Sequence, residues 1–116
     1  MMYFGFAISD SMFKGDYSIY RIEIGVEAFK EALESYDISV CLNPSHKATI
    51  DAMRSRYGID IHIPEKAPVV SLVPGDSLFV MQVRGLPRLD STRHEYTEEE
   101  IAGASFTFSL WNVYRM

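Results

Sequence analysis

A short apolar segment followed at once by a helix-like segment, residues 38–58, most constrains how this chain folds. Ile38–Leu42 is apolar and rich in β-branched residues, which predicts a buried strand. Asn43 and Pro44 then favour the start of a helix, because Asn is a good N-cap and Pro suits the first helical position. Gly58 is the expected end, since glycine readily adopts the left-handed conformation. The segment therefore predicts a strand, a tight turn and a helix.

The predicted helix has one apolar face and a polar start. Ile50, Met53 and Tyr57 recur at i, i+3 and i+7, so they should face the core. Ser45 and His46 precede them at the helix N-terminus, where unpaired N–H groups favour anions. His46 lies one turn before Ile50, and a helix N-terminus favours a proton-accepting imidazole there. The alternative is that His46 only caps the helix or packs beneath a loop.

Strand-like and helix-like patterns also occupy the remainder of the chain. Gly58–Ile63 alternates with period two, which predicts a short strand or an extended arm with His62 at the surface. The elements listed below and the strand–turn–helix unit at Ile38–Gly58 follow one another in an order that predicts a single α/β domain over residues 1–116. Its mixed sheet should have about five to six strands and be flanked by three helices. The further elements are strands at Met2–Ile8, Tyr17–Ile22, Leu78–Val83 and Ser105–Tyr114, and helices over Ile24–Leu33 and from a capping box at Thr97–Glu100.

A turn near the middle of the chain predicts a hairpin. Pro74 and Gly75 occupy the positions that a type II turn requires of them. Val69–Val73 and Leu78–Val83 flank the turn, and both segments are apolar enough to be buried strands. Residues 85–96 have no periodicity, and a loop of this length in a small domain is commonly functional or mobile.

Several polar residues are expected to meet at one edge of the sheet. If Met2–Ile8 and Ile38–Leu42 are parallel neighbours, their carboxyl ends share an edge, which is where ligands bind in open α/β sheets. Ser9 and Ser11 would then lie beside His46 and the helix N-terminus, and would converge on a small anion. The alternative is that both serines are ordinary turn residues.

The composition limits the classes of function. A net charge of −5 argues against binding nucleic acid over the whole surface. Between residues 43 and 93, however, bases outnumber acids by seven to five, which allows a local basic site or a mixed surface. The single cysteine, Cys41, suits a reducing, intracellular setting and a buried position. No segment has the pattern of a signal peptide, a membrane span, a metal site or a nucleotide-binding loop, so we expect no membrane, metal or cofactor.

The order of several short motifs resembles that of a known family. Ser9 and Ser11 lie in the first motif, His46 in the second, and Gln82 opens an arginine- and leucine-rich one. The chain is similar to small intracellular proteins of crenarchaeal viruses, a family that includes the viral anti-CRISPR ring nucleases that degrade cyclic tetra-adenylate. The resemblance and the length of 116 residues suggest that the chain is itself the 116-residue member from an icosahedral Sulfolobus virus. The resemblance covers nearly the whole chain and rests on order and spacing. The motifs are Ala7–Met12, Ser45–Thr49, Gly75-Asp76, Gln82 with Arg84–Leu89, and Thr97–Ile101.

This resemblance implies a homodimer that binds cyclic tetra-adenylate across its interface and acts without a metal in the host cytoplasm during infection. The implied reaction is attack by a ribose 2′-OH on the neighbouring phosphate. His46 matches the family histidine, Ser9 its serine, and Arg84 or Arg88 its arginine. The resemblance also implies ligand contacts from Ser11, Ser45 and Lys47, which lie in the matching motifs.

The chain departs from the family pattern at three places. Phe6 and Ser11 stand where the family has asparagines, and Arg88 or Ser91 stands where it has the glutamate thought to act as general acid. The nearest acid is Asp90, so Asp90 or Glu95 could protonate the leaving group, or the protein could bind without cleaving.

Two other functions stay open at the level of the sequence. One is a dimer that binds double-stranded DNA through paired basic faces and regulates viral genes, although Arg54 and Arg56 are a sparse basic face for one helix. The other is a scaffold protein, in which replacing His46, Arg84 and Arg88 would change nothing.

Overall fold

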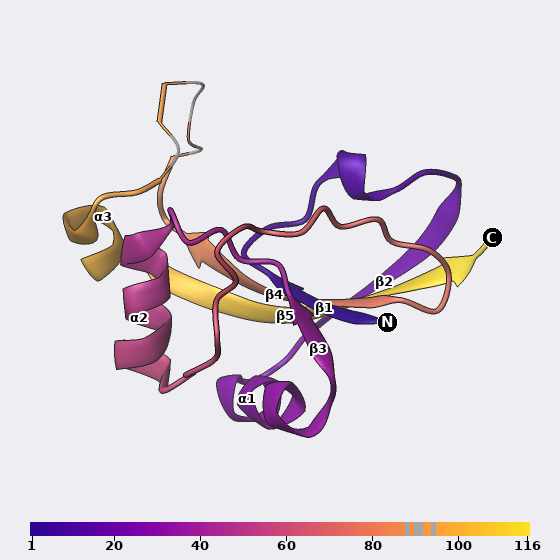
Figure 1. Cartoon of the computed structure of the whole chain (residues 1–116), viewed down its shortest axis with the longest axis horizontal. Coiled ribbons are helices and arrows are strands. Elements are labelled where there is room, and N and C mark those ends of the chain that lie inside the picture. Colours follow the sequence, from indigo (N-terminus) through magenta and orange to yellow (C-terminus); the bar gives the residue numbers. More distant parts are fainter. Residues whose placement is uncertain (88, 90–91, 94) are drawn as a thin grey trace.

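Five strands form one mixed sheet in the computed structural model, in the order β2-β5-β4-β1-β3 (Figure 1). The structure describes residues 1–87, 89, 92–93 and 95–116. β1 runs parallel to both β3 and β4, whereas β5 runs antiparallel to β4 and β2. The predicted α/β fold with a mixed sheet is confirmed. The strands are β1 (Met2–Gly5), β2 (Tyr17–Glu23), β3 (Ile38–Val40), β4 (Ser77–Arg84) and β5 (Ser105–Arg115).

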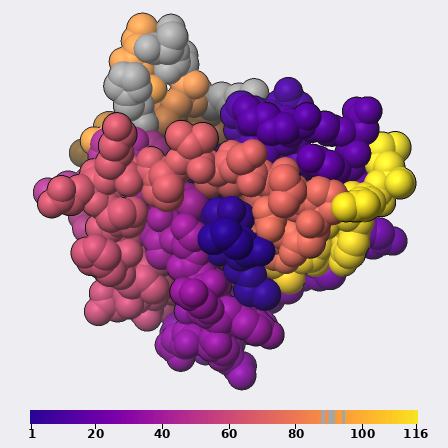
Figure 2. Space-filling view, turned by 45° about the vertical axis from the view of Figure 1, so that its right-hand side comes forward, coloured from indigo at the N-terminus to yellow at the C-terminus, as the bar shows by residue number. Residues whose placement is uncertain are grey.

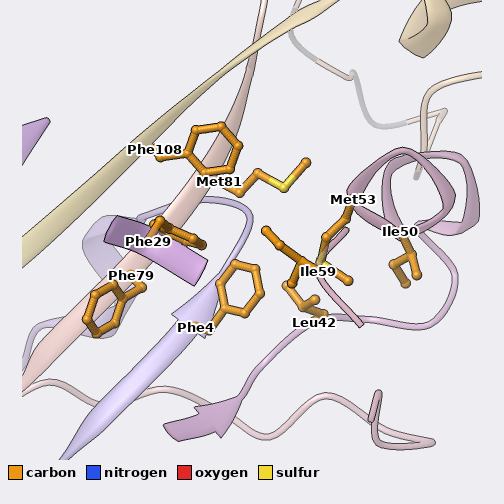
Figure 3. Close-up of a cluster of buried hydrophobic side chains, with 9 residues drawn as sticks. All are labelled: Phe4, Phe29, Leu42, Ile50, Met53, Ile59, Phe79, Met81 and Phe108. Atoms are coloured by element: carbon orange, nitrogen blue, oxygen red, sulfur yellow. The ribbon is translucent and has the colours of Figure 1, made fainter. Parts of the chain in front are cut away.

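Two helices cover one face of the sheet, and a third packs at the end of the molecule. The helices are α1 (Val26–Ser35), α2 (Lys47–Tyr57) and α3 (Glu98–Ala102), with a 3-10 turn η1 at Asp10–Met12. Figure 3 shows the core between sheet and helices: Phe29 of α1 lies among Phe4, Phe79 and Phe108 of the strands, and Ile50 and Met53 reach in from α2. α3 packs on α2 through Ile101, against Ala48 and Ala52.

The opposite face of the sheet is covered by irregular chain. Val70 and Leu72 pack there against the buried side chains of Leu78, Val80 and Val113. The segment that carries them follows α2 and crosses the surface of the molecule on its way to β4 (Figure 2). Residues 58–63, predicted as a short strand or an extended arm, form no strand, and His62 is exposed as expected.

The predicted turn is present, but the predicted hairpin is wrong. The Asp76 N–H donates to the Val73 carbonyl at 3.0 Å, and Gly75 has φ 97°, as a type II turn requires. The segment before the turn makes only one isolated bridge, between Leu72 and Phe13. The reason is that β4 already has β1 on one side and β5 on the other, so no edge is left for a hairpin partner.

Two predicted strands end earlier than expected. β1 stops at Gly5 and cannot extend to Ile8, because Phe6 packs with the core on the helical face, as Phe4 does, while Ile8 packs with the opposite cluster. Residues two apart in a strand share a face, so the chain must leave the sheet between them. β3 stops at Val40, although the Cys41 N–H still donates to the Phe4 carbonyl at 2.8 Å.

Two predicted helix starts are also wrong. The first helix begins at Val26 because the Ile24 N–H donates to the Phe108 carbonyl at 2.9 Å, which keeps residue 24 beside the sheet. The second helix begins at Lys47, with His46 as the capping residue. Asn43 forms a turn instead: its side-chain oxygen accepts the Ser45 N–H and its carbonyl accepts the His46 N–H, both at 3.0 Å.

The predicted end of α2 and the predicted capping box at the start of α3 are confirmed. Gly58 has φ 67° and donates its N–H to carbonyls at the end of α2, while Arg54 and Arg56 lie in the last turn. Thr97 and Glu100 form the expected capping box at the start of α3, which ends at Gly103.

Candidate functional site

The parallel strands bring three connecting segments together at one edge of the sheet. β1, β3 and β4 are parallel and therefore end on the same side, at Gly5, Val40 and Arg84. Two cavities of about 410 Å³ and 360 Å³ lie at this edge. Both are lined by Phe6, Ala7 and His46, so the segment after β1 and the start of α2 form the wall between them.

The first cavity brings together three of the residues expected from the sequence. Ser9, Ser11 and His46 all line it, and the Oγ atoms of the two serines lie 2.9 Å apart. Lys14 and Asn43 line it as well, which the sequence reasoning missed. Lys14 follows Ser9 and Ser11 in the same connecting loop, so its proximity to the serines was a signal that could have identified it. The cavity thus combines two hydroxyls, an amide, an imidazole and one ammonium group.

His46 is positioned by its backbone and by one ring contact. It is half-buried at the N-cap of α2, where its carbonyl accepts the Ile50 N–H at 3.0 Å. Its imidazole lies against the Phe6 ring, with 6.2 Å between centroids and an interplanar angle of 31°. The side chain makes no capping hydrogen bond. His46 therefore caps α2 through its backbone alone, and its imidazole faces the two cavities.

The N-terminus of α2 already has an anion beside it. The Lys47 N–H donates to Oε2 of Glu95 at 3.3 Å, so a carboxylate of the chain itself occupies a position where a free anion site was expected. Glu95 is 48 residues away in the sequence, and only the fold brings the two together. Its carboxylate caps the helix and also lines the second cavity.

The second cavity has a different chemical character. Phe6, Leu86 and Tyr96 give it an apolar and aromatic lining, and the Tyr96 hydroxyl donates to the Pro87 carbonyl at 2.8 Å. Gln82 and Glu95 are polar groups on its wall. The sequence reasoning singled out Gln82 by resemblance and Glu95 as a substitute acid, but gave Tyr96 no role.

The other expected site residues lie apart from the cavities. Arg84 is at the end of β4, where its Nε donates to Thr107 Oγ1 at 3.5 Å, and it lines neither cavity. Ser45 and Lys47 are exposed and line neither cavity. Arg88 and Asp90 lie outside the described residues.

Cys41 lines the first cavity as a protonated thiol. Burial raises the pKa of its thiol, and its Sγ donates to the Ser39 carbonyl at 3.5 Å. A thiol in this state is a poor nucleophile at neutral pH.

Metal ligands and membrane spans were also sought in the described part of the chain. No group of three or more His, Cys, Asp or Glu side chains there is arranged to hold a metal ion. None of the described helices combines the length and the apolar character needed to cross a membrane.

Comparison with known proteins identifies the fold. No protein-family model matches the sequence, and no curated protein sequence matches it. Among solved structures, B116 of Sulfolobus turreted icosahedral virus (STIV) is similar, with a TM-score of 0.65, 18% sequence identity, and coverage of 96% of this chain and 97% of that chain. At this identity the two chains are different proteins and the likeness concerns the fold. This chain therefore has the same α/β fold as B116 over nearly its whole length.

Proposed function

We propose that this chain is a protein of a crenarchaeal virus that binds and cleaves cyclic tetra-adenylate, and so neutralises type III CRISPR signalling in the host cytoplasm. The observation that carries the proposal is the convergence of Ser9, Ser11, Lys14 and His46 on one cavity. The fold shared with B116, a protein of a Sulfolobus virus, and the order of motifs along the chain support the same assignment.

The groups around the first cavity suit cleavage by an internal nucleophile. A ribose 2′-OH attacks the adjacent phosphorus, the bond from phosphorus to the 5′-oxygen breaks, and the products are a 2′,3′-cyclic phosphate and a 5′-hydroxyl. His46 orients the 2′-OH and accepts its proton. The hydroxyls of Ser9 and Ser11 donate to the non-bridging oxygens, and the Lys14 ammonium stabilises the negative charge that develops on them. The nucleophile belongs to the substrate, so the step needs no metal-activated water.

The leaving 5′-oxygen requires a proton. Asp90 and Glu95 are the two acids that the sequence offers for this step. Glu95 accepts a hydrogen bond from the Lys47 N–H beside His46, so it can donate a proton only in its protonated form. Arg84, at the same edge of the sheet, approaches a phosphate only from outside the two cavities. Ser45 and Lys47 are exposed beside His46, where they can contact the outer part of a bound ring.

A ring of four nucleotides is larger than one cavity of about 410 Å³. Its two-fold symmetry matches that of a homodimer, in which each subunit supplies one His46. The proposal therefore includes binding across a dimer interface.

The test is single-turnover cleavage of labelled cyclic tetra-adenylate in the presence of EDTA. Replacing His46 by alanine should slow cleavage by roughly 10²- to 10⁴-fold, because the proton acceptor is lost. His62→Ala is the matched control, since His62 is exposed on the arm after α2 and lines neither cavity.

The outcomes separate the alternatives. Tight binding without cleavage would restrict the protein to sequestering the ring. Neither binding nor cleavage would overturn the proposal, and duplex DNA binding would then be tested through its steep dependence on salt.

A further inference from the structure

The two edges of the sheet differ in how they meet solvent. β3 forms one edge, and it has only three residues, Ile38–Val40, all half-buried. β2 forms the other edge with seven residues, Tyr17–Glu23, of which all but Tyr17 are exposed. Strands have about 5 to 6 residues on average, so β2 is long for an edge strand. The N–H and C=O groups on its outer side form a row that can pair with another extended chain.

β2 lacks the features that commonly protect an edge strand. It contains neither Lys nor Pro. Its one cation, Arg21, has its guanidinium 5.7 Å from the centre of the Trp111 ring of β5, so this charge lies over the inner sheet rather than at the open edge. The side chains of Tyr20 and Ile22 are 66% and 48% exposed. The edge of β2 therefore presents apolar side chains beside its backbone groups.

A third cavity lies at the amino end of this edge. It has a volume of about 220 Å³, and Tyr17 and Ile19 of β2 form part of its lining. Phe13 adds an aromatic ring, and Asp10 and Asp16 add two carboxylates. Within the described part of the chain, neither carboxylate takes part in an ion pair. Aromatic rings and carboxylates together attract a Lys or Arg side chain.

Charge also favours a foreign strand over a second copy of this chain as the occupant of the edge. Two copies of β2 related by a two-fold axis would run antiparallel, so the carboxyl end of one would approach the amino end of the other. That arrangement would bring Glu23 of the second copy toward the two carboxylates of the third cavity, and like charges would face each other. Arg21 could not offset them while its guanidinium lies over Trp111. A strand that brings its own basic residue is the better match.

We propose that the edge of β2 binds an extended segment of a partner protein by strand addition, with a basic side chain of that segment in the third cavity. The backbone of the segment pairs with the outer N–H and C=O groups of β2. Side chains alternate along a strand, so the basic residue faces the side of Tyr17 and Ile19 while its apolar neighbours face the side of Tyr20 and Ile22. β2 lines neither of the cavities used in the proposed function, so this proposal is independent of ring cleavage.

The experiment is an NMR titration of the isotope-labelled protein with short, blocked peptides in which valine and threonine alternate and one lysine takes each position in turn. At least one position of the lysine should give saturable shifts of the backbone amides of residues 17–23 and of Gly15. Replacing that lysine by norleucine should weaken binding by roughly 2- to 10-fold, the range for an exposed contact of a cation with a ring or a carboxylate. N-methylation of alternate peptide residues should abolish binding in one phase of the alternation only, because every second N–H faces β2.

Matched variants of the protein locate the contacts. Asp16→Asn should weaken binding of the lysine peptide and leave the norleucine peptide unchanged, whereas Asp37→Asn changes an exposed aspartate outside the third cavity and should affect neither. Tyr20→Lys should weaken both peptides by roughly 2- to 5-fold, because it replaces an apolar cross-strand partner by a charge. Tyr36→Lys makes the same substitution at an exposed tyrosine outside β2 and is the control.

Three results would overturn the proposal. One is the absence of saturable shifts along β2 with every peptide, and another is equal affinity for the lysine and norleucine peptides. The third is a molecular mass that rises with concentration in the wild type and not in Tyr20→Lys, which would assign the edge to a second copy of the chain. Tyr20→Lys should cleave cyclic tetra-adenylate at the rate of the wild type, so failure of this proposal is distinguishable from failure of the proposed function.

Discussion

His46 shows how a single residue acquires its place from contacts at short and long range. Its backbone position follows from the turn at Asn43 and the start of α2, which are local. Its ring position follows from Phe6, which arrives from the end of β1. Phe6 thereby places an aromatic wall beside the imidazole. The wall positions the imidazole through packing rather than through a hydrogen bond.

Glu100 gives a prediction about pH. Its ion pair with Arg93 and the backbone hydrogen bond from Thr97 lower the pKa of its carboxyl from an ordinary value of 4.5 to about 2. A carboxylate with a lowered pKa stabilises the fold above its unfolded pKa, and that contribution is lost as pH falls toward the folded value. Urea denaturation should therefore show that Glu100→Gln loses more free energy of unfolding, relative to wild type, at pH 7 than at pH 3.

Glu99→Gln removes the same charge from an exposed position in the same helix and is the control. An equal loss for Glu100→Gln at both pH values would contradict the assigned pairing.

Gly58 gives a prediction about backbone conformation. Its φ of 67° is in the left-handed region, where a Cβ atom is strained. Gly58→Ala should lower the free energy of unfolding by roughly 1–2 kcal/mol in chemical denaturation. Gly103→Ala is the matched control because Gly103 ends α3 with φ −89°, which alanine adopts without strain. Equal effects of the two substitutions would argue against strain as the cause.

At the scale of elements, the central place of β4 decides much of the architecture. Its apolar residues alternate between the two faces, with Phe79 and Met81 toward the helices and Leu78 and Val80 toward the irregular cover. A strand buried on both faces suits the middle of a sheet, which is where parallel and antiparallel neighbours meet here.

The basic residues of α2 are used within the molecule, since Arg54 donates to the Ile61 carbonyl and Arg56 to the Ile101 carbonyl. Because both arginines are engaged in hydrogen bonds within the molecule, α2 is poorly suited to bind in a groove of DNA.

The attachment of α1 to the sheet depends on Phe29. Its ring is fully buried and lies 5.0–5.7 Å from the rings of Phe4, Phe79 and Phe108. Phe29→Ala should cost roughly 3–5 kcal/mol, because burial is lost and a cavity is left. Thermal and urea unfolding measure the change, and Glu31→Ala on the exposed side of α1 is the control. A cost below roughly 1 kcal/mol would mean that α1 contributes little to the core.

At the scale of the whole molecule, the cavities occupy the carboxyl edge of the parallel strands, while the long edge strand β2 is at the far side of the sheet. The net charge of −5 is compatible with binding an anion only if local cations offset it. Lys14 is such a local cation on the first cavity. Ligand affinity should therefore fall with rising salt.

The proposed dimer makes a quantitative prediction about the assembly. Light scattering should give a mass of twice 13.2 kDa, and calorimetry should find one cyclic tetra-adenylate for two chains. The Lys14→Met variant should bind the ring more weakly and keep the dimer mass. A stoichiometry of one ring for each chain would contradict binding across an interface.

The sequence by itself determined what is local. The apolar stripe of α2, its end at Gly58, the capping box of α3 and the turn at Gly75 all arise from side chains within a few residues of one another. The order of strand-like and helix-like segments also predicted the α/β class. The convergence of Ser9, Ser11 and His46 followed from the expectation that the first and third strands are parallel neighbours, because parallel strands end at a shared edge.

Only the tertiary structure decided what depends on distant partners. The hairpin expected around Gly75 is absent because β1 and β5 occupy both sides of β4. Glu95 meets the start of α2 from 48 residues away, and the second cavity exists because β1 is shorter than β4. These features depend on competition between strands for the same neighbour and on long-range contacts, and the local pattern of a sequence carries neither.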